Sequence, residues 1–186
     1  RQRPRSTTTP GRDPMPIISN TSPLIFFAKV GQTNLLHLLY GDIWVPNAVR
    51  DEIAVGAGTD AELQIFDSQR IVVMDAPEDR VRIASRAGLD RGEAEVVALG
   101  QAQGSGTLIL IDDKIGRRFA GQSGLQTVGT GGALVAAKQA GLIERIRPVF
   151  EQMFAEGLYL HETLYHQLLA IAREAQQAND NDWQAI

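Results

Sequence analysis

The chain has 186 residues, of which 44% are hydrophobic and 22% are charged, and it contains no cysteine. This length suits one domain with a substantial core, and the lack of cysteine excludes disulfides and thiolate metal sites. The net charge of −4 argues against a broad duplex-binding surface, which needs an excess of basic residues. No apolar run approaches the roughly 18 residues that span a bilayer, so we expect a cytoplasmic protein without a membrane segment.

The two ends of the chain differ in composition from its middle. Residues 1–14 are rich in Arg, Thr and Pro, and we expect a disordered N-terminal extension there. Residues 177–186 are mostly polar and are predicted to form a flexible tail. The folded domain is therefore expected to span residues 15–176.

Short apolar runs alternate with helical patterns along this domain. The predicted strands are residues 16–19, 43–45, 71–74, 107–111 and 125–128. One predicted helix begins at Pro46. The other predicted helices are residues 24–30, 33–40, 60–68, 78–87, 91–103, 114–121, 133–140, 143–155 and 161–176. This alternation predicts an α/β fold of three layers, in which helices flank a central parallel sheet.

Three helix starts carry recognisable signals. Ser22 is a good N-cap, and Pro23 then fits the first helical position. Asp90 is expected to cap the helix 91–103. The glycine-rich segment Gly129–Gly132 is predicted to form a tight turn before a helix that begins at Ala133.

Acidic residues lie at intervals along the alternating pattern, at Glu52, Glu93 and the pair Asp112–Asp113. The pair comes directly after the apolar run 108–111. In an open α/β sheet, ligands bind outside the carboxyl ends of the strands. Carboxylates gathered there, without thiolates, suit a hard divalent cation with oxygen ligands. The pattern therefore points to phosphodiester hydrolysis assisted by such a cation.

Each of these acids also has an ordinary structural interpretation. Glu52 could be a surface charge, and Glu93 stands in a first helical turn, where an acid favours the helix dipole. Asp112 or Asp113 could simply cap the following helix. Glu95, two residues after Glu93, is expected to face solvent.

Five segments resemble, in order and spacing, the motifs of PIN-domain nucleases, in particular the VapC-like toxins of toxin–antitoxin modules. They are Ile18–Leu24, Val45–Glu52, Arg91–Glu95, Leu110–Asp113 and Val128–Leu134. The resemblance runs from about Met15 to Arg173. It implies a parallel sheet beneath an acidic pocket, Mg²⁺ or Mn²⁺ as cofactor, and hydrolysis of RNA.

The resemblance also implies roles for individual residues. The four acidic positions of the family fall on Asn20, Glu52, Glu93 and Asp113, with Asp112 as an alternative for the fourth. The implied catalytic set is therefore Asn20, Glu52, Glu93 and Asp113. The implied metal ligands are Asn20, Glu93, Asp112 and Asp113, and Glu52 would bind through water or orient the nucleophile.

Two further residues are expected to support the site. The Ser/Thr position of the family falls on Ser22, which would help to order the pocket. Arg117 could contact the RNA backbone or pair with a pocket carboxylate, although a place on the helix surface fits as well.

Asn20 is a departure from the family pattern, in which this position is usually an aspartate. Its amide oxygen can coordinate a cation, but it brings no negative charge and cannot act as a base. The additional carboxylate of Asp112 could compensate for the missing charge. We interpret Asn20 as the trait of a branch of the family.

The leading functional hypothesis is a metal-dependent endoribonuclease that acts as a toxin. The resemblance implies an RNA substrate, a small antitoxin protein that blocks the pocket, and a homodimer. The alternative is a PIN-like module with weak or no catalysis that binds RNA or protein. A receiver-like domain is a third interpretation, and the position of Lys114 directly after the paired acids argues against it.

Overall fold

The computed structural model describes residues 17–56, 58, 62, 64–67, 70–104 and 106–174. Its strands are β1 (Ile17–Ser19), β2 (Ile43–Pro46), β3 (Ile71–Met74), β4 (Leu108–Leu110) and β5 (Gln126–Val128). They form one parallel sheet in the order β3-β2-β1-β4-β5. The predicted central parallel sheet is thereby confirmed. The expected extension at 1–14 and tail at 177–186 lie outside the described residues.

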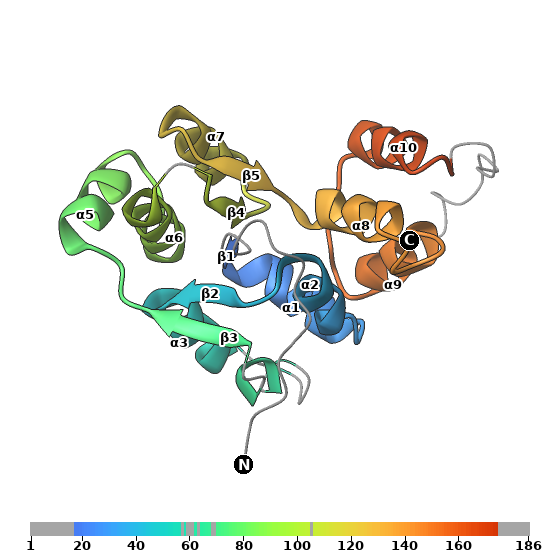
Figure 1. The fold of residues 1–186 in the computed structure, drawn as a ribbon, viewed down its shortest axis with the longest axis horizontal. Coiled ribbons are helices and arrows are strands. Elements are labelled where there is room, and N and C mark those ends of the chain that lie inside the picture. The colour runs from blue at the N-terminus through green and yellow to red at the C-terminus, as the bar shows by residue number, and fades with distance from the viewer. Residues whose placement is uncertain are drawn as a thin grey trace, which may run out of the picture.

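Helices flank this sheet, as predicted (Figure 1). They are α1 (Thr21–Lys29), α2 (Thr33–Tyr40), α3 (Asn47–Gly56), α5 (Glu78–Arg86), α6 (Arg91–Gln103), α7 (Lys114–Gln122), α8 (Thr130–Gln139), α9 (Arg147–Ala155) and α10 (Glu162–Ile171). Helices α5 and α6 lie on one side of the sheet, and α1 and α2 lie on the other (Figure 1). None of the described helices is long and apolar enough to cross a membrane.

The chain reverses direction across the sheet at its centre. It steps outward from β1 to β2 and β3, and then returns through α5 and α6 to β4, on the other side of β1. The last residues of β1 and β4 are in register, Ser19 beside Leu110. The backbone N–H of Asn20 extends this pairing by donating to the Leu110 carbonyl at 2.9 Å. Ligands bind at such a switch point in open α/β sheets.

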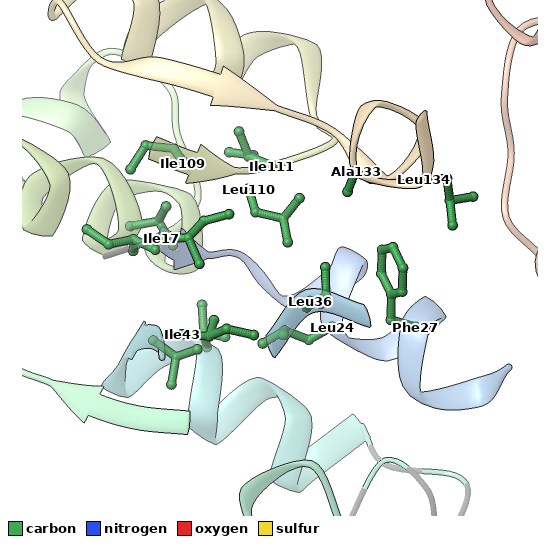
Figure 2. Close-up of a cluster of buried hydrophobic side chains, with 14 of the residues drawn as sticks. Ile17, Leu24, Phe27, Leu36, Ile43, Ile109, Leu110, Ile111, Ala133 and Leu134 are labelled. Atoms are coloured by element: carbon green, nitrogen blue, oxygen red, sulfur yellow. The ribbon is translucent and has the colours of Figure 1, made fainter. Parts of the chain in front are cut away.

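The core lies on both faces of the central strands. Ile17 and Ile18 of β1, like Ile109 and Leu110 of β4, have no exposed surface. Figure 2 shows side chains of α1, α2 and α8 gathered beside these strands, among them Phe27. On the opposite face, every residue of α6 from 92 to 100 is buried. A helix buried on all sides is held rigidly, and its first turn is therefore a firm platform for side chains.

Several predicted element boundaries differ from those of the structure. Helix α1 begins at Thr21 with Asn20 as its N-cap, two residues before the position that Ser22 and Pro23 indicated. Pro46 is the last residue of β2, so α3 starts one residue later than predicted. The helix expected over 143–155 is shorter and begins at Arg147. The predicted helix 60–68 falls partly outside the described residues, and Gln64–Asp67 form a 3₁₀ helix.

Candidate functional site

Asn20 stands at the carboxyl end of β1, in the N-cap position of α1. An asparagine in this position usually accepts a hydrogen bond from a backbone N–H of the first turn. Here the side chain makes no such bond, and Oδ1 is buried with no hydrogen-bond partner among the described residues. Because burying a polar atom without a partner costs free energy, this oxygen is suited to meet a bound group.

Glu93 lies in the first turn of α6, where a capping box holds it. Its backbone N–H donates to Asp90 Oδ1 at 2.8 Å, and the Asp90 N–H donates to Glu93 Oε2 at 3.2 Å. The predicted capping role of Asp90 is confirmed. The Glu93 side chain is only 8% exposed, so its carboxyl group lies in a largely dry place.

Asp113 faces Glu93 from the start of α7. Its Oδ1 accepts hydrogen bonds from the backbone N–H groups of Ile115 at 2.6 Å and Gly116 at 2.8 Å, so Asp113 is the N-cap of α7. The charge of Asp113 is one of the causes that raise the pKa of Glu93. Gly116 lets the first turn of α7 pack closely on Ile111, because a Cβ there would lie 2.4 Å from Ile111 Cδ1.

The surroundings of Glu93 raise the pKa of its carboxyl group. Burial, followed by the charges of Asp90 and Asp113, raises the pKa of Glu93 from 4.5 to about 7, against the opposing hydrogen bond from the Asp90 backbone. At neutral pH Glu93 is therefore about half-protonated.

Glu52 reaches the same edge of the sheet from α3. Its carboxylate accepts a hydrogen bond from the Thr21 hydroxyl, in the first turn of α1. The same carboxylate lies against Gly92, because a Cβ on Gly92 would stand 3.1 Å from Glu52 Oε1. Glu52 thus bridges the residue after Asn20 and the residue before Glu93. The structure therefore brings Asn20, Glu52, Glu93 and Asp113 to one edge, where the first turns of α1, α6 and α7 meet.

Asp112 turns away from this group and caps α8. Its Oδ1 accepts from the backbone N–H of Thr130 at 2.7 Å, and its Oδ2 accepts from the Thr130 hydroxyl at 2.6 Å. Helix α8 consequently begins at Thr130, and the tight turn predicted for Gly129–Gly132 is wrong. Gly129 leaves room for the cap, because a Cβ there would lie 2.8 Å from Asp112 Oδ1.

This geometry makes Asp112→Ala a test of the capping role. We expect the change to lower the free energy of unfolding by about 1–2 kcal/mol, because both hydrogen bonds to Thr130 are lost. Chemical denaturation of the metal-free protein measures this difference. Asp79→Ala is the control, since it removes an exposed first-turn carboxylate of α5. Equal stability of the two variants would contradict the capping role.

Glu95 and Ser22 lie differently from what the sequence led us to expect. Glu95 does not face solvent as expected: it is 5% exposed and accepts from the Ala48 N–H and from Arg91 Nε, both at 2.9 Å. It therefore caps α3, the helix that carries Glu52. Ser22 lies exposed in the first turn of α1, and the hydroxyl that contacts Glu52 is that of Thr21. Sequence reasoning missed Thr21, although it stands inside the first motif.

The donors at this edge are all oxygens, as Mg²⁺ and Mn²⁺ prefer. Among the residues that the structure describes, no group of three or more acidic or histidine side chains is arranged as a metal site. The fit rests instead on the buried, unpaired Asn20 Oδ1 and on Glu93, whose pKa is raised by burial and by the charges of Asp90 and Asp113. A cation could replace the proton on Glu93 and meet the amide oxygen. The donor chemistry therefore fits a hard divalent cation.

Comparison with known families gives a match to the PIN domain over residues 16–174, a range that includes all of the described residues. No curated protein matches the sequence.

Proposed function

This chain belongs to the PIN-domain family of nucleases, and we propose that it is an endoribonuclease that depends on a divalent cation. The observation that carries the proposal is the pair of Glu93 and Asp113 at the carboxyl edge of the sheet. Burial and the charges of Asp90 and Asp113 raise the pKa of Glu93 to about 7, which marks a place where negative charge collects. Such a place favours a divalent cation, and a cation there would attract a phosphodiester.

In this proposal Glu93, Asp113 and the Asn20 amide oxygen hold Mg²⁺ or Mn²⁺. The bound cation would stabilise the charge that develops on the scissile phosphate and activate water for attack. The capping box of Glu93 and the helix-capping bonds of Asp113 hold these two carboxyl groups in place. Glu52, fixed by Thr21, orients the attacking water from the exposed side.

We further propose that the cleavage serves a toxin of a toxin–antitoxin module. The five motifs resemble those of VapC-like toxins, and this resemblance supports the assignment. In this proposal a small antitoxin protein blocks the pocket, the chain forms a homodimer, and the substrate is cellular RNA.

The test is cleavage of a mixed pool of RNA by the purified protein. We expect cleavage with Mg²⁺ or Mn²⁺, and its loss in EDTA and in the double variant Glu93→Gln/Asp113→Asn. The matched control is Glu151→Gln/Asp79→Asn, which neutralises two exposed acids away from this edge and should cleave normally. A control that fails as badly as the site variant would refute the assignment of the pocket.

A second function is favoured by one specific observation. Asn20 brings no charge, and the described residues hold no cluster of three acids ready for a metal. This arrangement would suit a module that binds RNA or protein without cutting it. The same assay separates the two functions: a folded protein that neither cleaves RNA nor binds Mn²⁺ would favour the binding module.

A further inference from the structure

A hollow that Asp112 lines lies next to the candidate site. Its volume is about 280 Å³, and Asp112, Arg117 and the first turn of α8 form one side of it. The connection between α9 and α10 forms the other side, with Leu158, Tyr159 and Leu160. This connection runs past the start of α8, near the tip of β5 (Figure 1). Because Asp112 and Asp113 are adjacent in the chain, the hollow is a neighbour of the proposed cleavage centre.

Among the aromatic residues that the structure describes, Tyr159 is unusual because its surface is 85% exposed. The residues on either side of it, Leu158 and Leu160, are half-buried and anchor the connection on the core. A large exposed ring between two half-buried neighbours is held in place and is open to a partner. A flat partner could stack on such a ring.

The wall opposite Tyr159 carries a positive and a negative side chain. A Cβ on Gly129 would lie 2.8 Å from Asp112 Oδ1 and 3.5 Å from Arg117 Nη1, so both groups border the same small space. Arg117 forms no ion pair within the described part of the chain, and its guanidinium can donate to a ligand. Gly129 has no side chain, so the space between these two groups stays open on this wall.

We propose that this hollow binds one unpaired base of the RNA strand, stacked on Tyr159 and held at its edge by Arg117 and Asp112. The inference rests on the proposed function and names a contact that positions the strand beside Glu93 and Asp113. Aromatic stacking accepts any base, whereas a guanidinium and a carboxylate on one wall offer hydrogen bonds to a base edge. A base in a duplex would have to leave its stack first, so the hollow favours single-stranded RNA.

The experiment measures binding without cleavage. A fluorescently labelled single-stranded RNA of mixed sequence is titrated with the protein in EDTA, and its anisotropy is followed. We expect Tyr159→Ala to weaken binding about tenfold and Tyr159→Phe to bind within about twofold of the original, because stacking needs the ring and not the hydroxyl. Ile83→Ala is the matched control, since Ile83 is also an exposed apolar side chain but lies on α5.

Steady-state cleavage in Mg²⁺ gives a second measurement. We expect Tyr159→Ala to raise KM about tenfold and to leave kcat nearly unchanged. If Tyr159→Ala cleaves RNA and binds it with unaltered affinity, the base-binding proposal is overturned and the nuclease assignment stands. The hollow would then have another occupant, such as a protein segment. Binding that depends on Tyr159 in a protein that never cleaves would support the hollow and refute the nuclease function.

Discussion

Replacing Glu93 by glutamine is expected to abolish RNA cleavage and, at the same time, to stabilise the metal-free protein at pH 8. The loss of activity should be roughly 100-fold or more, because even outer-shell partners of a metal site are worth about 10–100-fold. The gain in stability arises because glutamine resembles the protonated form of Glu93. Its amide can accept from the Asp90 N–H and donate to Asp113 without a negative charge.

The direction of the pH effect follows from the raised pKa. Between 4.5 and about 7, folded Glu93 binds a proton that the unfolded chain has released. The contribution of Glu93 to stability is therefore fully present below pH 4.5 and is lost as pH rises to about 7. The rise of the pKa from 4.5 to about 7 corresponds to a loss of roughly 3–3.5 kcal/mol. Glu93→Gln should remove this part of the pH dependence.

Chemical denaturation of both proteins in EDTA, at pH 5 and at pH 8, tests this prediction. Mn²⁺ provides an independent readout, because it should raise the melting temperature of the original protein at pH 8 but not that of Glu93→Gln. Glu78→Gln is the control, since Glu78 is an exposed first-turn acid of α5. Normal cleavage by a folded Glu93→Gln protein would remove Glu93 from the catalytic group.

Asn20→Asp is expected to raise RNA cleavage and to destabilise the metal-free protein, which is the reverse of what we expect for Glu93→Gln. A carboxylate in place of the unpaired amide oxygen adds a charged ligand, and the affinity for Mn²⁺ should rise about tenfold, because ligand charge is one of the factors that set such affinities. Cleavage at limiting metal should rise with it. The metal-free protein should become less stable at pH 8, because the new carboxylate would be buried at an edge that already carries the acids Glu93 and Asp113.

Mn²⁺ titration followed by electron paramagnetic resonance measures the affinity, and denaturation in EDTA measures the stability. Asn34→Asp is the matched control, because Asn34 is exposed on α2 and the change adds the same charge far from the strand ends. A folded Asn20→Asp protein with weaker Mn²⁺ binding would show that the Asn20 oxygen does not meet the cation.

Much of the fold follows from local sequence pattern. The ranges of α2, β3 and α6 agree with the prediction at both ends, because each has a clear apolar period and a strong boundary signal such as Asp90. The misplaced boundaries lie where a distant contact decides the first turn. Helix α8 starts at Thr130 because Asp112, 18 residues earlier, accepts its N–H and its hydroxyl. Sequence signals near Thr130 contain no trace of that bond.

In the candidate site, too, the sequence predicts one part and distant contacts decide the rest. The sequence alone determined that oxygen-bearing side chains follow β1 and β4, and parallel pairing must bring the ends of those strands together. It could not decide between Asp112 and Asp113, which are adjacent and chemically identical. Only the packing of α6, α7 and α8 around the sheet assigns one carboxylate to Thr130 and the other to Glu93. Neighbouring residues project in different directions, and what each direction meets depends on elements distant in the chain.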